Sequence, residues 1–261
     1  MEIVIALAIL IQFIYADNFP LFELDRELTV CGISGSRVFG GIEWPWMVIL
    51  LYHNRMVCGG TLISRRHILT AAHCVAEVHP YAVRFGVTDH FSPGLDLPIS
   101  KITINKEYNK ALIFKDISLL TLPRDIQFTE KIRPICLPHI DYGKTEDLRG
   151  RTAVVVGYGK PKFTEPATGR LKEIKLPVVS LSECQLFYHS RIDDNVICAG
   201  KGHKAVCHGD SGGPLMTLEK GRYFLAGVVS YGVECERRGF PTVFQRTGAY
   251  LDWIKAVMKK G

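Results

Sequence analysis

Ser211 stands in a stretch of the chain whose residue types suit nucleophilic catalysis. The stretch reads Cys207-His208-Gly209-Asp210-Ser211-Gly212-Gly213-Pro214, so glycines flank a single hydroxyl. Because glycine has no Cβ, this backbone can turn sharply and approach a substrate closely. A serine hydroxyl alone is a weak nucleophile; it needs a neighbouring base and a third group that orients the base. The rest of the chain must therefore supply both groups.

His73 and Asp116 are the candidates for these two groups. His73 follows an apolar run in Leu69-Thr70-Ala71-Ala72-His73-Cys74, and Asp116 precedes another in Lys115-Asp116-Ile117-Ser118-Leu119-Leu120. An imidazole titrates near neutral pH, which suits a group that accepts and returns a proton. An acid among apolar neighbours needs a partner, because an unpaired buried charge is costly. Spacing alone does not establish contact, since the chain has nine histidines.

Three motifs together carry a resemblance to a known family. TAAHC, DISLL and GDSGGP, in that order, resemble the active-site segments of the chymotrypsin-like (trypsin-fold) serine endopeptidases. PICLP, GYG, CAG and VSYG fit as well, and the likeness runs from about Cys31 to the C-terminus. The order His, Asp, Ser differs from that of subtilisins and α/β-hydrolases. The resemblance implies Ser211 as nucleophile, His73 as general base and acid, and Asp116 as orienting carboxylate, with the N–H groups of Gly209 and Ser211 as the oxyanion hole.

The N-terminal part of the chain is expected to be processed. Residues 3–16 are almost all apolar, and fourteen residues suit a signal peptide better than a bilayer span. A short membrane anchor or a buried helix is the alternative. Val38-Phe39-Gly40-Gly41 resembles the mature N-terminus of the family, so cleavage after Arg37 would free an ammonium group on Val38 that pairs with Asp210. We therefore expect a signal peptide over 1–16, an activation propeptide over 17–37 and a catalytic domain over 38–261, although Ser36-Arg37 read alone is also an ordinary loop.

The eight cysteines are an even number, which in an exported chain favours disulfides. Zinc is the competing interpretation, but no pair has the close spacing of structural zinc sites. Spacing leaves the connectivity open. The family resemblance implies the pairs Cys31–Cys136, Cys58–Cys74, Cys184–Cys198 and Cys207–Cys235. The first pair would keep the cleaved propeptide attached as a short light chain.

The resemblance also implies a specificity pocket. Its floor, six residues before the nucleophile, is Asp in trypsins but Ala205 here, followed by Val206. Its walls correspond to Ser230, Gly232 and Thr242, and Thr242 replaces a glycine and makes the pocket shallower. We expect medium apolar side chains before the scissile bond, because a substrate Arg or Lys would lack a partner there. Glu234 or Glu236 reaching into the pocket is the alternative for basic substrates. Since the predicted pocket rejects Arg, cleavage after Arg37 requires a separate trypsin-like protease.

The hydropathy pattern predicts an all-β fold. Short alternating or apolar runs separated by turns fill two stretches, roughly 38–143 and 151–245. They predict two antiparallel six-stranded barrels with the active site in the cleft between them. Tyr250, Trp253, Ile254, Val257 and Met258 recur at helical spacing and predict a docked C-terminal helix. Gly157-Tyr158-Gly159 lacks the third glycine, the helix and the downstream acid of a dinucleotide loop.

The composition and net charge of the chain limit the classes of partner that we expect. The formal net charge of +6 can attract acidic partners, but without a dense Lys/Arg run it is better read as a solvated basic face. We expect a secreted, extracellular monomer with protein or peptide substrates, an activating trypsin-like protease and macromolecular protease inhibitors, and neither nucleic acid nor membrane. We expect no cofactor and no metal, since Val87 stands where calcium-binding trypsins begin their loop with Glu. Alternatives are a catalytically silent homologue acting as a binding protein or toxin, and an esterase or lipase.

Overall fold

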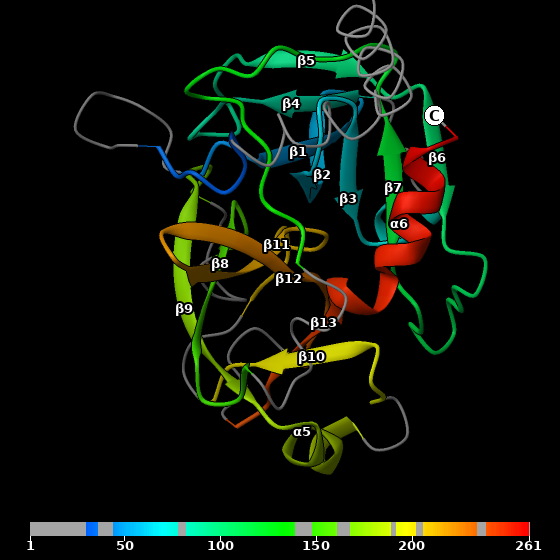
Figure 1. Cartoon of the computed structure of the whole chain (residues 1–261), viewed down its shortest axis with the longest axis vertical. Helices are drawn as coiled ribbons and strands as arrows, with labels where there is room; N and C mark the ends of the chain where they lie inside the picture. Colours follow the sequence, from blue (N-terminus) through cyan, green and yellow to red (C-terminus); the bar gives the residue numbers. More distant parts are fainter. Residues whose placement is uncertain are drawn as a thin grey trace, which may run out of the picture.

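The computed structural model describes residues 30–35, 44–77, 82–138, 148–160, 168–188, 192–201, 206–233 and 239–260. Two antiparallel β units lie one above the other, with β1 to β7 in the first and β8 to β13 in the second (Figure 1). The predicted all-β class and the C-terminal helix are confirmed. The predicted signal peptide, the bond after Arg37, and Ala205 and Cys235 lie outside the described residues.

The first unit is a seven-stranded antiparallel sheet in the order β5-β4-β1-β2-β3-β7-β6. Its two edge strands, β5 and β6, are separated in the chain only by Ile99 and Ser100, so the sheet curls until its edges approach each other. The Ser100 N–H and hydroxyl both donate to the Thr121 carbonyl, at 2.9 and 2.8 Å, which fixes this corner. Where six strands were expected, this break after Pro98 gives seven. The strands are β1 (Met47–Tyr52), β2 (Arg55–Leu62), β3 (His67–Thr70), β4 (Ala82–Phe85), β5 (Leu95–Pro98), β6 (Lys101–Ile104) and β7 (Ser118–Thr121).

The second unit is a closed barrel in the order β10-β13-β12-β11-β8-β9, as predicted. Closure pairs every strand on both sides and leaves no sheet edge. Valine-rich runs supply the inward-facing residues, and β8 is buried along all but its first residue. The strands are β8 (Thr152–Gly157), β9 (Lys172–Val179), β10 (Val196–Ala199), β11 (Pro214–Glu219), β12 (Arg222–Tyr231) and β13 (Thr242–Arg246).

The two units share part of their core. One cluster of buried side chains joins Ile49 and Leu119 of the first unit to Val156 and Met216 of the second. The Trp46 indole N–H lies 2.9 Å from the Met216 sulfur, across the same boundary. Because the interior is continuous, side chains that reach the boundary from either unit are held in fixed relative positions.

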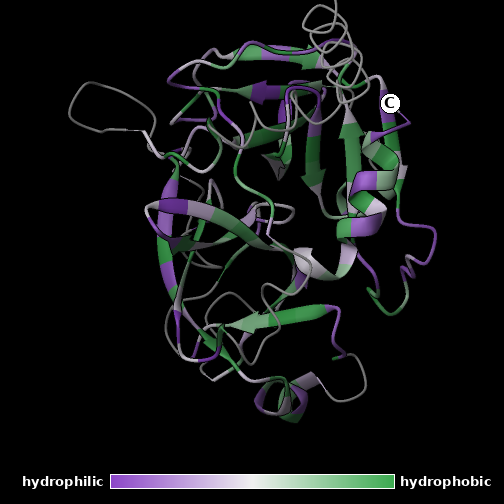
Figure 2. Cartoon of the chain, viewed as in Figure 1, coloured by the Kyte–Doolittle hydropathy of each residue, from purple (hydrophilic) through white to green (hydrophobic). Residues whose placement is uncertain are grey.

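Short helices complete the described fold: α3 (His73–Ala76), α5 (Leu181–Tyr188), η3 (Thr247–Tyr250) and α6 (Leu251–Met258). Hydrophobic and hydrophilic residues alternate around α6 (Figure 2), and its Ile254 is part of the core shared by the two units. No helix among the described residues is long and apolar enough to cross a membrane. Helix α5 was not predicted, although its start carries a signal: the Ser180 hydroxyl accepts from the Glu183 N–H at 3.1 Å, the first half of a capping box.

Three of the four predicted disulfides lie within the described residues: Cys31–Cys136, Cys58–Cys74 and Cys184–Cys198. Cys207 is also disulfide-bonded, and its predicted partner is Cys235. The segment at Cys31 is docked as well as bonded, since the Gly32 N–H donates to Pro134 and its carbonyl accepts from Tyr223, both at 2.9 Å. The described segment 30–35, which precedes the predicted cleavage point, is therefore tied to the body of the protein.

Candidate active site

Strand pairing brings His73 and Asp116 to the same end of the first sheet. Strand β3 ends at Thr70, which pairs with Ser118 at the start of β7. In an antiparallel pair the end of one strand lies beside the start of the other. His73, three residues after Thr70, and Asp116, two residues before Ser118, therefore meet. His73 Nδ1 lies 2.7 Å from Asp116 Oδ2, and the His73 backbone N–H donates to Oδ1 at 2.8 Å.

The Asp116 carboxylate is fully buried and receives a further hydrogen bond from the second barrel. The Ser230 hydroxyl donates to Asp116 Oδ2 at 2.6 Å. Ser230 is the extra residue of a bulge in β12, between the pairs Val229–Phe244 and Tyr231–Val243. A bulge redirects a side chain out of the regular alternation of a strand. The carboxylate is thereby satisfied as an anion, which fixes the orientation of the His73 ring.

Ser211 reaches the same region from the turn before β11. Its carbonyl accepts from the Gly59 N–H of β2 at 2.8 Å. The next residue, Gly212, has φ +77°, and a Cβ there would overlap the Thr70 hydroxyl and the Gly59 carbonyl. Only glycine can be accommodated at position 212, so the turn that contains Ser211 packs against the end of β3, which leads into His73. The structure thus brings all three predicted residues to the boundary between the units.

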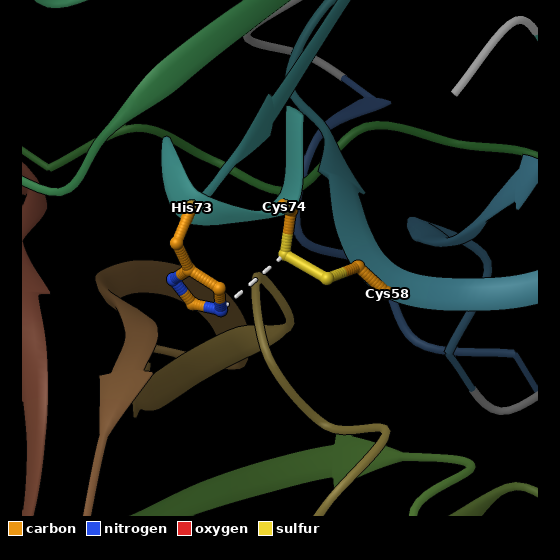
Figure 3. Close-up of side chains that lie close together, drawn as sticks. All are labelled: Cys58, His73 and Cys74. Carbon is orange, nitrogen blue, oxygen red and sulfur yellow. Dashed lines mark hydrogen bonds between the residues drawn. A yellow bond between two sulfur atoms is a disulfide. The ribbon is translucent and has the colours of Figure 1, made fainter. Parts of the chain in front are cut away.

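His73 also lies beside the Cys58–Cys74 disulfide. Figure 3 shows the imidazole next to this bond, and His73 Nε2 is 3.7 Å from the Cys74 sulfur. The atoms of these three residues are close enough to hold a metal ion. A disulfide sulfur is not a thiolate, and the thiolate is the form that binds metals. The disulfide instead ties β2 to α3 and holds His73 in place.

Asp210 is a buried acid next to the serine. Its carboxylate accepts from the Gly159 N–H at 2.8 Å and from the Cys207 N–H at 3.0 Å. A Cβ on Gly157 or Gly159 would overlap this carboxylate, so both glycines are needed to admit it. Burial raises the pKa of Asp210, against the lowering effect of these two N–H groups and of Lys172. The site therefore holds a carboxylate whose charge is only partly compensated.

The chain is similar in sequence to known proteins. The family described as Trypsin matches residues 33–254. The chain belongs to the trypsin family. It is 39% identical to a venom protease of Bombus pensylvanicus over 83% of this chain and 96% of that protein. It is 35% identical to the proclotting enzyme of Tachypleus tridentatus over 86% and 68%, and 36% identical to the venom serine protease Bi-VSP of Bombus ignitus over 85% and 69%. As a member of the trypsin family, it is a serine endopeptidase.

Parts of the predicted specificity pocket lie together in this trypsin-family fold. A Cβ on Gly232 would lie 3.7 Å from the Thr242 hydroxyl, so the glycine faces Thr242 and leaves the space of one side chain open beside it. Val206 packs against the core of the second barrel. Ser230, also expected in a pocket wall, directs its hydroxyl to Asp116 instead. A separate hollow of about 250 Å³ opens beside the imidazole, lined by His73, Glu77, Tyr108, Lys110, Ile113 and Ser230.

Two features of the site were missed in the sequence. The bond between Ser230 and Asp116 spans 114 positions, and no local pattern marks it. The pair Gly157 and Gly159 had a signal, because glycine in or next to a strand often marks a close approach of other atoms. In this trypsin-family chain the approaching group is the Asp210 carboxylate.

Proposed function

We propose that this protein is a secreted zymogen of a serine endopeptidase in which Ser211, His73 and Asp116 form the catalytic triad. The observation that carries the proposal is the bond of 2.7 Å between His73 Nδ1 and the buried Asp116 carboxylate. The Gly212 contact, which seats the Ser211 turn at the same strand end, supports it. A buried acid, an imidazole and a hydroxyl in this order perform acyl transfer.

In the proposed reaction, the Ser211 hydroxyl attacks the carbonyl carbon of the scissile peptide bond. His73 Nε2 takes the serine proton and then gives it to the leaving amine, which produces an acyl-enzyme. Water, activated by the same imidazole, attacks the ester and releases Ser211. Asp116 keeps the proton of the resting ring on Nδ1 and stabilises the imidazolium that forms in each step.

The N–H groups of Gly209 and Ser211 are proposed to bind the developing oxyanion. Gly209 has φ +101°, a conformation that favours glycine. The neighbouring N–H groups of Asp210 and Gly213 are used within the turn, at 3.0 Å each. Among the described residues, the amides of Gly209 and Ser211 have no such partner. Two donors left available next to the nucleophile suit charge that appears only in the transition state.

Activation is proposed to occur by cleavage after Arg37. The new ammonium group of Val38 would pair with the Asp210 carboxylate, which is buried and would gain from a cation because burial disfavours its charge. Because Asp210 precedes Ser211, this pairing would order the turn that holds the oxyanion donors. Before cleavage this turn would not be ordered, and the protein would therefore be inactive.

Specificity for medium apolar side chains is proposed from Ala205, Val206, Gly232 and Thr242. The Thr242 side chain, which faces Gly232 where a glycine at position 242 would leave more room, supports a shallow pocket. Such a pocket rejects Arg, so a trypsin-like protease would cut after Arg37, and macromolecular inhibitors would block the open cleft. Incubation of the isolated zymogen tests this: we expect no self-cleavage at Arg37. Clean self-cleavage that is lost in Ser211→Ala would overturn it, as would an Arg/Lys preference on a peptide panel.

The catalytic assignment is tested by peptide-amide hydrolysis with the cleaved protein and two variants. We expect Ser211→Ala to be inactive and Asp116→Asn to lose about 10⁴-fold in kcat, because the amide stabilises the wrong tautomer of the imidazole. Thr61→Val, which removes a buried hydroxyl of the first sheet that has no hydrogen-bond partner among the described residues, is the matched control and should retain activity. Equal activity of Asp116→Asn and the control would contradict the assignment.

A further inference from the structure

A line of buried hydrogen bonds continues from Asp116 into the second barrel and ends at Tyr250. The Tyr250 hydroxyl donates to Gln245 Oε1 at 2.7 Å, and Gln245 Nε2 donates to Ser230 Oγ at 3.3 Å. Ser230 in turn donates to Asp116 Oδ2 at 2.6 Å. All four side chains belong to residues at most 4% exposed. We define Tyr250, Gln245 and Ser230 as the buried relay.

The buried relay crosses the boundary between the two units. Asp116 lies just before β7 of the first unit, Ser230 and Gln245 on neighbouring strands of the second barrel, and Tyr250 in η3 before the C-terminal helix. Of the three relay residues, Ser230 is the one whose hydroxyl hydrogen-bonds to the Asp116 carboxylate, which also accepts from His73. That hydroxyl sits on a bulge, where the regular ladder does not fix its direction. Gln245 supplies the missing constraint: its amide donates to one lone pair of the Ser230 oxygen, and the Ser230 proton is then directed to Asp116.

We propose that Gln245 and Tyr250 are positioning residues for catalysis, which act through Ser230 to hold the Asp116 carboxylate against His73. This inference rests on the proposed function and adds two residues to its machinery that touch neither the substrate nor the reacting atoms.

Every hydrogen bond of the relay has its proton directed toward the carboxylate. Bonds aligned in this way polarise one another, and the effect is largest where water is absent. Tyr250 is suited to the outer position, because burial raises the pKa of its phenol and the charges of Asp193, Asp116 and Glu107 raise it further, opposed only by Arg246. The hydroxyl thus remains a donor throughout the pH range in which such an enzyme works.

The test uses the full chain, activated by an added trypsin-like protease and titrated with a phosphonylating reagent. Gln245→Met keeps the side-chain length but removes both hydrogen-bonding groups. We expect kcat on a peptide amide, per titrated site, to fall about threefold to tenfold, the effect of one neutral hydrogen bond, while KM is unchanged. Tyr250→Phe should lower kcat by about twofold. Tyr250→Phe made in the Gln245→Met variant should lower kcat no further, because the relay is already broken.

Ile254→Val is the matched control. It trims a fully buried side chain on α6, one turn after Tyr250, and removes no hydrogen-bonding group of the relay, so it should lower stability but leave kcat per titrated site unchanged. Wild-type kcat per site in both relay variants would overturn the proposal, as would losses that simply multiply in the double variant. If Gln245→Met does not fold, Tyr250→Phe, which keeps its ring, decides alone. A wild-type chain that takes up no reagent would refute the proposed function itself, and the relay with it.

Discussion

Gly159→Ala should lower the activity of the enzyme about a hundredfold without unfolding it. A methyl group at this position would lie about 2.5 Å from both oxygens of the Asp210 carboxylate. The φ of Gly159 is not among the positive values of the described glycines, so the backbone itself accepts alanine. The carboxylate must therefore move. It cannot do so without weakening its bonds from the Gly159 and Cys207 N–H groups, at 2.8 and 3.0 Å.

The size of the effect follows from these two bonds. A hydrogen bond to a charged acceptor contributes about 1.5–3 kcal/mol, so the loss of one or both costs about 3 kcal/mol. If this free energy destabilises the conformation of the Gly209–Ser211 turn that binds the oxyanion, kcat/KM drops about a hundredfold. Burial elsewhere is untouched, and we expect only a modest fall in Tm.

The assay compares kcat/KM on a peptide amide, with Tm measured by calorimetry, for Gly159→Ala and Gly221→Ala. Gly221 has φ +79° and open space around it, so alanine there strains the backbone by about 1 kcal/mol but clashes with nothing. The control should lose stability and keep its activity. If Gly159→Ala retains kcat/KM within about threefold of the control, the reasoning about Asp210 is wrong.

Three further predictions follow from other parts of the structure. Replacing Cys58 and Cys74 by Ser should lower the free energy of unfolding by about 3 kcal/mol and reduce kcat, because their loop precedes and carries His73; unchanged urea denaturation would contradict this. Burial and, secondarily, Arg66 lower the pKa of His67 below 6.5, opposed by Asp125, so the folded state disfavours its protonation. The neutral His67 side chain therefore contributes its full stability above pH 6.5, and this contribution is lost as the pH falls through the lowered pKa of the folded state. Urea denaturation at pH 7.5 and at pH 5.5 should show a larger fall in the free energy of unfolding for wild type than for His67→Phe. Thr242→Gly should raise the rate on substrates with an aromatic side chain before the scissile bond, as read from a chromogenic peptide panel, and an unchanged profile would count against the proposed pocket.

Much of the fold was predictable because its signals are local. Alternating hydropathy identified the antiparallel β units, and helical spacing identified α6, since each pattern reflects the burial of one side of a single element. The split of a strand at Ile99–Ser100, which makes seven strands instead of six, depends on how the sheet curls. Helix α5 was overlooked although Ser180 and Glu183 mark its start.

The candidate site, like the fold, was predictable only in part. The motifs around His73, Asp116 and Ser211 were visible in the sequence, and strand pairing explains why the first two meet. The role of Ser230 was not visible, because a bulge turns its hydroxyl toward a residue 114 positions away. The relay beyond it, through Gln245 and Tyr250, depends on the packing of β12, β13 and η3 and has no counterpart in sequence spacing.

The most direct test of the central claim is the location of a covalent label. The chain, cleaved after Arg37, is treated with a phosphonylating reagent, digested and analysed by mass spectrometry. We predict one phosphonyl group per molecule, attached to Ser211, and none in a His73→Ala variant. A label on another residue, or equal labelling with and without the imidazole, would contradict the account.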